Sequence, residues 1–305
     1  MPKTLTTQKN LSKTDFMYGS RVLLLALTFF LFVSAFDGLA QRRKKPSTPA
    51  SQAQEFLNTQ WWLGIRGGAN FSQTTLIKSY SGLNPINYSN ENLEKEYENF
   101  ANPAFHIGLD VTFYHKGFSV MSFPTFFRNN INYSSELSWL GNSERDQYKT
   151  SYNVKQSITF LELPLAVKYD IIGNKIRPFV MAGAFYSIAF DANKEVQIFE
   201  TDYASGQPVE FERANIKLNN KEEIKNNWGV LGGVGVSFDF WNIRSIIDIQ
   251  YRHSFQSIVN SETRFSESTF SSFGEVQDDY SLQNYSASLS FVFPLRYIDS
   301  QFKAL

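Results

Sequence analysis

The sequence alternates between apolar and small or polar residues over long stretches, most clearly in NYSASLSFVF at residues 284–293. Successive side chains of a β-strand point to opposite faces, so this segment would place its leucine and phenylalanines on one face and its serines on the other. The pattern predicts an all-β protein in which each strand has one apolar face. The other segments that alternate in this way are 61–71, 105–113, 161–169, 230–239 and 247–253.

Two less regular segments, 118–127 and 177–190, complete a set of eight predicted strands. Both are apolar on each face in places, so the alternation leaves their registers open. Pro124 and Pro164 each lack the N–H that a neighbouring strand would bind. We therefore expect a β-bulge at each of these prolines.

The connections between the predicted strands are alternately short and long. Tight hairpins are expected at 114–117, 170–175 and 240–244. The other connections far exceed the usual hairpin length of two to five residues, and they are 72–104, 129–157, 191–227 and 254–283. An even number of strands with this rhythm is typical of an up-and-down transmembrane β-barrel. We expect an eight-stranded antiparallel barrel over residues 61–295, with short periplasmic turns, long extracellular loops and both termini in the periplasm.

The apolar face of these strands is predicted to contact lipid. It carries no charged residue at mid-strand, as expected where a cation at the bilayer midplane would cost roughly 2–4 kcal/mol. Aromatic residues gather near the strand ends, as they do at membrane interfaces. The residues predicted to face lipid are Leu63, Ile65, Ile107, Leu109, Val111, Leu163, Leu165, Val234, Val236, Ile247, Ile249, Leu289 and Phe291.

The opposite face is predicted to line a narrow lumen. Eight strands enclose little more space than side chains fill, which fits the many glycines and serines at these positions. Charges of both signs also occur on this face, and enclosed charges need partners. We expect salt bridges among them, although the sequence does not assign the pairs. These residues are Arg66, Asp110, Glu162, Lys168, Asp239, Asp248 and Arg252.

A soluble barrel is the alternative interpretation of the same alternation. In a periplasmic lipocalin-like carrier, the apolar face would point inward around an apolar ligand. A water-facing surface would normally carry many lysines, glutamates and threonines, whereas the polar face here is crowded with glycine, alanine and serine. The composition of that face favours the membrane barrel.

The first 40 residues are predicted to be a secretory signal peptide. Basic residues precede an apolar run at 22–36, and Gly38 and Ala40 occupy the positions that a signal peptidase reads before Gln41. The run is shorter than the roughly 18 residues of a membrane-spanning helix. Residues 41–60 are basic and then rich in Pro, Ser, Ala and Gln, so we expect a flexible periplasmic linker. Residues 296–305 would form a C-terminal tail.

The composition excludes several kinds of chemistry. The chain has no cysteine and only 3 histidines, which removes disulfides, thiolate sites and cysteine nucleophiles. No pair of histidines has metal-ligand spacing. His253 and Ser254 are adjacent, so on a strand they would face opposite sides and could not act together. We expect no enzyme activity, no metal and no cofactor, and with a formal net charge of zero no nucleic-acid partner.

The long loops are the predicted interaction surface because loops on a rigid scaffold often carry binding. Together they are acidic, which would suit a basic secretion or surface protein, or divalent cations that bridge to lipopolysaccharide. Outer-membrane lipid and lipopolysaccharide are the other expected partners. The loop 254–283 offers Arg264 as its basic residue, and its acidic residues are Glu262, Glu267, Glu275, Asp278 and Asp279.

Several segments together resemble the PorT-like outer-membrane β-barrel proteins. They are LGIRGGANFS at 63–72, FLELPLAVKYDIIGNKIRPFVMAGA at 160–184 and GVLGGVGVSFDF at 229–240. The resemblance covers roughly residues 61–295. It implies a barrel in the outer membrane of a Gram-negative bacterium after signal cleavage near Ala40. Some members serve type IX secretion and gliding motility, so it also implies a non-enzymatic structural or interaction role, accessory to such an assembly.

Overall fold

The computed structural model describes residues 59–80, 95–100, 102–140, 147–171, 176–203, 206–240, 243–265 and 270–295. The predicted signal peptide, the predicted tail after Leu295 and most of the predicted linker lie outside these ranges. Thr59 and Gln60, which we had assigned to the linker, already belong to the first strand. Within the described ranges, no helix is long and apolar enough to cross a membrane.

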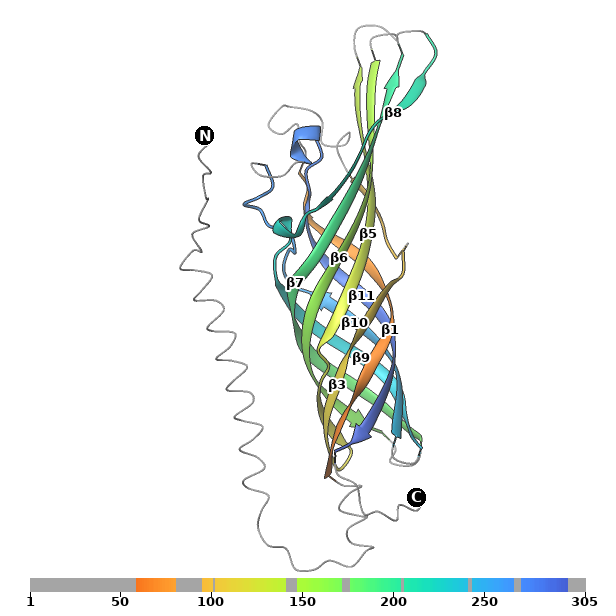
Figure 1. Ribbon diagram of the computed structural model, residues 1–305, viewed down its shortest axis with the longest axis vertical. Helices are drawn as coiled ribbons and strands as arrows, with labels where there is room; N and C mark the ends of the chain where they lie inside the picture. The colour runs from red at the N-terminus through yellow and green to blue at the C-terminus, as the bar shows by residue number, and fades with distance from the viewer. Residues whose placement is uncertain are drawn as a thin grey trace, which may run out of the picture. The chain divides into compact units, whose positions relative to one another are not determined.

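Antiparallel strands close into a ring with eight positions (Figure 1). β4 and β5 share one position, which is interrupted between them. The ring closes because β1 pairs with β3 on one side and with β11 on the other. This confirms the predicted all-β, eight-stranded, up-and-down barrel. Its strands are β1 (Thr59–Lys78), β3 (Ala104–His115), β4 (Phe118–Ser122), β5 (Thr125–Leu140), β6 (Gln147–Asp170), β7 (Ile176–Asp202), β9 (Asn227–Phe240), β10 (Ile243–Ser254) and β11 (Asp279–Pro294).

One wall of the barrel extends far beyond the ring as a sheet (Figure 1). There β5, β6 and β7 continue, β2 (Lys95–Glu98) pairs with β5, and β8 (Val209–Asn219) pairs with β7. We call this five-stranded part the extension sheet. The prediction that 129–157 and 191–227 are loops was therefore wrong over most of their length. Alternation continues in these segments, as with Ile131 and Tyr133, but the apolar residues now face inward.

The two prolines behave differently from each other. At Pro124 the wall strand breaks, and the carbonyl oxygen of Pro124 accepts from the Leu109 N–H at 3.0 Å. At Pro164 the predicted bulge is absent, and β6 pairs with β7 without a break. The register shift lies instead between Thr159 and Phe160. Pro164 is tolerated because β6 has no ladder partner on its β4–β5 side between the pairs made by Glu162 and Leu165.

The hairpin between β3 and β4 has a two-residue turn, Lys116–Gly117. Their φ angles are 48° and 93°, and positive φ at both positions is the mark of the tight turn that matches strand twist. The predicted hairpin at 114–117 is confirmed in shortened form, since Tyr114 and His115 still belong to β3. The other two predicted hairpins lie partly outside the described residues.

The register of the two ambiguous segments is now fixed. Val120 of β4 lies opposite Phe113 of β3 and Val167 of β6. Val180 of β7 lies opposite Tyr169 of β6 and Val234 of β9. Both valines are exposed on the outer face of the barrel.

Candidate functional site

The outer face of the ring is apolar. Ile65, Ile107 and Leu165 are among its most exposed side chains, at 60%, 67% and 60%. Eleven of the thirteen residues that we predicted to face lipid are exposed there, and Val111 and Val236 are half-buried on the same face. The carrier alternative required these side chains to point inward, so the structure does not support it.

Paired aromatic rings mark both edges of this apolar band. At the short-turn end the pairs are Trp61–Phe113 and Phe118–Tyr169, and at the opposite end they are Phe126–Phe190, Trp228–Phe255 and Tyr251–Tyr285. On β1, Trp61 and Phe71 are ten residues apart. At ~3.3 Å per residue and a tilt of ~40°, they differ by about 25 Å in height, which is the usual apolar band of a membrane barrel.

The lumen is filled by charged side chains, beginning with a cluster around Arg66. Its Nη2 lies 3.2 Å from Oδ2 of Asp110, and its Nη1 lies 3.0 Å from Oδ2 of Asp248. All three side chains are fully buried. Thr112 and Gln250 donate further hydrogen bonds to the two carboxylates. The cluster ties β1, β3 and β10 together across the interior.

A second buried pair joins Arg252 of β10 to Glu162 of β6. Their Nη1–Oε2 distance is 2.8 Å, and Ser187 donates to the same carboxylate. The Arg252 guanidinium lies over the ring of Phe127 at 4.3 Å, a cation–π contact that is worth more where water is excluded. Removing one partner of such a pair costs roughly 3–5 kcal/mol, because the other charge stays buried and unpaired.

A third group of charges lies toward the short-turn end. Lys168 pairs with Asp170 at 3.0 Å. Asp239 accepts from both Arg177 and Arg244, at 2.7 and 2.6 Å. Asp239 retains 23% side-chain exposure and so lies at the rim, whereas Lys168 and Asp170 are buried.

All seven charged residues predicted for the lumen thus have charged partners. We had not predicted Asp170, Arg177 and Arg244. Asp170 could have been found, because it lies two residues after Lys168 and so shares its face. The two arginines lie at strand beginnings, next to hairpins, where the alternation is too short to assign a face.

At the other end of the barrel, the segment between β10 and β11 packs against the extension sheet. We call residues 255–278, between β10 and β11, the cap. Ile258, Val259 and Phe270 of the cap pack against the inner face of β5, β6 and β7 in one buried hydrophobic cluster. The cap also forms an isolated bridge to Ile224, just after the short 3-10 helix η2 (Lys221–Glu223). A second short 3-10 helix, η3 (Ser271–Phe273), lies within the cap.

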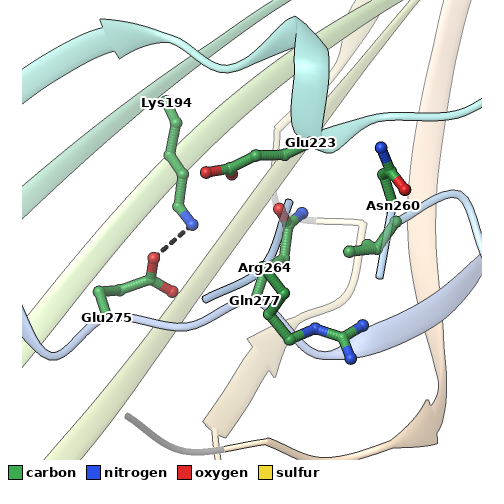
Figure 2. Close-up of a pocket in the computed structure, with 7 residues that line it drawn as sticks. Lys194, Glu223, Asn260, Arg264, Glu275 and Gln277 are labelled. Atoms are coloured by element: carbon green, nitrogen blue, oxygen red, sulfur yellow. Dashed lines mark hydrogen bonds and ion pairs between the residues drawn. The ribbon is translucent and has the colours of Figure 1, made fainter. Parts of the chain in front are cut away.

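Ion pairs anchor the cap to the extension sheet (Figure 2). Glu275 pairs with Lys194 of β7 and accepts a 2.7 Å hydrogen bond from Tyr133 of β5. Both charged side chains are fully buried or nearly so. Although burial alone would raise it, the neighbouring Lys194 and the Tyr133 hydroxyl hold the pKa of Glu275 below its ordinary value. Burial and the same carboxylate raise the pKa of Tyr133.

The acidic character predicted for loop 254–283 is therefore largely neutralised. Asp278 pairs with Lys95 at 2.6 Å and accepts from Tyr97, and Asp279 pairs with Arg264. The lysines that pair with this loop, Lys95 and Lys194, belong to β2 and β7, so the sequence of the loop alone could not predict the ion pairs. Glu262 is exposed, and Glu267 lies outside the described residues.

A small pocket lies between the cap and the extension sheet (Figure 2), and it has room for about one water molecule, ~10 Å³. Its polar lining consists of Lys194, Glu223, Asn260, Arg264, Glu275 and Gln277. The side chains largely satisfy one another, as the Lys194–Glu275 pair shows. The pocket does not resemble a substrate site, because it is small and its charges are already paired.

No catalytic arrangement is present among the described side chains. Ser254 donates to Asn227 at 3.0 Å, not to His253. His106 lies 3.0 Å from the Ser288 hydroxyl and stacks on Phe127, with no carboxylate among its hydrogen-bond partners. Within the described part of the chain, no three His, Asp or Glu side chains gather as metal ligands would.

Three solved structures illustrate what the chain is similar to. They are the attachment invasion locus protein Ail of Yersinia pestis (10% identity, 77% of this chain, 99% of that chain, TM-score 0.30), OprG of Pseudomonas aeruginosa (12%, 79%, 98%, 0.40) and neisserial surface protein A (10%, 75%, 95%, 0.30). No curated protein sequence matches the chain.

The family described as outer membrane protein beta-barrel domain matches residues 43–260, more than half of the chain. The apolar outer band and the filled lumen agree with that match. The chain therefore belongs to the family of proteins with an outer membrane protein beta-barrel domain.

Proposed function

We propose that the protein is a non-enzymatic, non-conducting barrel of the Gram-negative outer membrane, with a structural or interaction role that it performs through the extension sheet. The observation that carries this proposal is the filled lumen. Within the described lumen, five basic side chains meet five acidic ones, so each of these charged side chains has a partner of opposite charge. They are Arg66, Lys168, Arg177, Arg244 and Arg252, and Asp110, Glu162, Asp170, Asp239 and Asp248.

Fractionation and gel mobility test the location of the protein. We expect it to sediment with outer membrane and to migrate faster on an SDS gel when it is not boiled. The mature chain would begin at Gln41, which mass spectrometry of the purified protein checks. Recovery from the soluble periplasmic fraction without a mobility shift would contradict an integral barrel.

Reconstitution in a planar bilayer tests the non-conducting lumen. The buried pairs around Arg66 and Arg252 obstruct the interior, so we expect no stable current steps from the purified barrel. Arg66→Ala combined with Arg252→Ala would remove two large side chains and should give small, brief currents. Steady porin-sized steps from the unmodified protein would rule out a plugged barrel.

We further propose that the barrel is accessory to a secretion or gliding assembly of the type IX kind. The resemblance of the LELPL and RPF segments to PorT-like proteins supports this role. A strain that lacks the gene should secrete less type IX cargo or glide poorly, and the full-length gene should restore both. Normal secretion and motility in that strain would refute the accessory role and leave the barrel proposal intact.

A further inference from the structure

The outward face of the extension sheet changes from apolar to polar within one row of residues. Phe126, Leu161 and Ile188 lie side by side on β5, β6 and β7 and form the last apolar row. The next paired row is Arg128, Thr159 and Asp191, and the exposed Phe190 at the register shift of β7 is the last apolar side chain beside it. Two residues along a strand correspond to about 7 Å. The polar face therefore begins immediately beside the band that would contact acyl chains.

On β5, β6, β7 and β8, two rows of this polar face consist only of side-chain amides and hydroxyls. The lower row lies one row beyond Arg128, and the upper row lies four residues further along the strands. The lower row is Asn130, Ser157, Asn193 and Asn219, and the upper row is Ser134, Asn153, Gln197 and Asn215. On the other side of Ser134 the exposed Glu96 of β2 extends the upper row. Neighbouring strands lie about 4.8 Å apart, so each row presents a regular line of hydrogen-bonding groups.

The two rows differ in their hydrogen bonds. In the lower row, Asn193 and Asn219 both donate to Asp191 at 2.7 Å, and Ser157 accepts from Arg128 at 2.6 Å. In the upper row, none of the four side chains has a hydrogen-bond partner among the residues that the structure describes. The side chains of the lower row are thus held by hydrogen bonds within the protein, whereas the donors and acceptors of the upper row are available to a ligand.

Lys155 lies between these rows on β6 and is exposed. Its cross-strand neighbour Glu195 pairs with Lys217 on the other side, at 3.6 Å. Lys155 itself has no ion pair within the described ranges. On β5 to β8 the face therefore combines four uncommitted neutral groups with one uncommitted cation, and its acid in the upper row, Glu96, lies on β2, two strands away from Lys155.

We propose that the upper row and Lys155 bind the phosphorylated saccharide of lipopolysaccharide in the surrounding outer leaflet. Sugar hydroxyls donate and accept, as side-chain amides do, and a lysine ammonium is a suitable point charge for phosphate. The face is continuous with the apolar band, so a lipopolysaccharide molecule with its chains on that band has its sugars beside the extension sheet. This inference rests on the proposed function, which sets the barrel in that membrane with the sheet outside.

Binding of fluorescent lipopolysaccharide to the full-length, delipidated barrel tests the inference, with anisotropy as the measurement. Lys155→Gln should weaken binding about tenfold, since it removes a charge-assisted contact. The triple variant Asn153→Ala, Gln197→Ala, Asn215→Ala should weaken it by a similar factor. Lys116→Gln is the matched control, because this exposed lysine lies at the short-turn end, and it should bind as the parent does.

Two further measurements sharpen the result. Dephosphorylated lipopolysaccharide should bind the parent and Lys155→Gln equally, but should still distinguish the triple variant. If both variants bind intact lipopolysaccharide as tightly as the parent, the face is only solvated and the inference is wrong. The parent protein should also insert into phospholipid vesicles that contain no lipopolysaccharide, and the gel-mobility shift reports this insertion. If the protein does not insert, the membrane barrel itself is refuted.

Discussion

The ring of the barrel and the extension sheet use the same strands with opposite polarity. On β5, Phe126 faces outward in the ring, whereas Ile131 and Tyr133 face inward in the extension. The period of two is unchanged, but the apolar residues move from one face to the other between these positions. What surrounds the strand sets this choice: lipid outside requires an apolar exterior, and water outside allows an ordinary buried core.

Loss of a lumen charge should have the largest effect on the ring. Arg66→Met would leave Asp110 and Asp248 buried without their cation, at a cost of roughly 3–5 kcal/mol. Urea titration of the barrel in vesicles, followed by tryptophan fluorescence, measures this loss. Arg66→Met combined with Asp110→Asn and Asp248→Asn should recover much of it. Equal losses in the single and triple variants would mean that the charges do not act as one cluster.

A cation introduced on the outward face should have the next largest effect, and it should harm the ring but not the extension sheet. Leu163→Arg or Leu289→Arg places a charge where lipid is expected and should cost roughly 2–4 kcal/mol, which reduces assembly in the membrane. The same change on the outward face of the extension, Asn153→Arg, should be tolerated. The fraction of barrel that shows the gel-mobility shift reports the outcome. Normal assembly of both leucine variants would contradict a lipid-facing ring.

The cap pairs are expected to matter only locally. Glu275→Gln removes the charge opposite Lys194 but keeps a side-chain oxygen that can accept its hydrogen bond, so it should lower the stability of the cap by about 1–3 kcal/mol, less than the loss of a whole partner. Limited proteolysis should then cut the 255–278 segment faster, while the gel-mobility shift of the ring persists. Glu262→Gln, at an exposed position of the cap, is the control. A loss of the mobility shift in Glu275→Gln would mean that the cap and ring unfold together.

The pH dependence of the cap should be the mildest effect. The pKa of Glu275 is lower in the folded protein than its ordinary value of 4.5. Its contribution to stability is therefore complete above about pH 4.5 and is lost as pH falls through the folded-state pKa. Proteolysis of the cap should accelerate in that acidic range. In Glu275→Gln the acceleration should be smaller, and an unchanged pH profile in that variant would assign the effect to other groups.

The ring was predictable from the sequence because alternation reveals a face directly. Leu63 and Ile65 alternate with Gly64 and Arg66, and that is enough to divide outside from inside. The extension sheet was missed because Asn, Ser and Lys are common in its segments. A strand of the ring has an apolar exterior, so these polar segments were predicted to be loops. The inward residues alone, such as Ile131 and Tyr133, gave too short a signal.

The ion pairs could not be assigned from the sequence for a different reason. Which charges meet across a lumen depends on how neighbouring strands are staggered, and a face assignment carries no such information. Arg66 and Asp248 lie on β1 and β10, with β11 between them. The cap was likewise out of reach, since its partners Lys95 and Lys194 lie far away in the sequence.

The contact between Arg66 and Asp248 crosses the seam where the first and last strands of the ring meet. It can form only after β1 and β11 have joined, because until then the two residues belong to opposite ends of an open sheet. In an open sheet Arg66 could still pair with Asp110 on the neighbouring β3, but Asp248 on β10 would lack its cation. Closure of the cylinder therefore also supplies the partner of this buried acid.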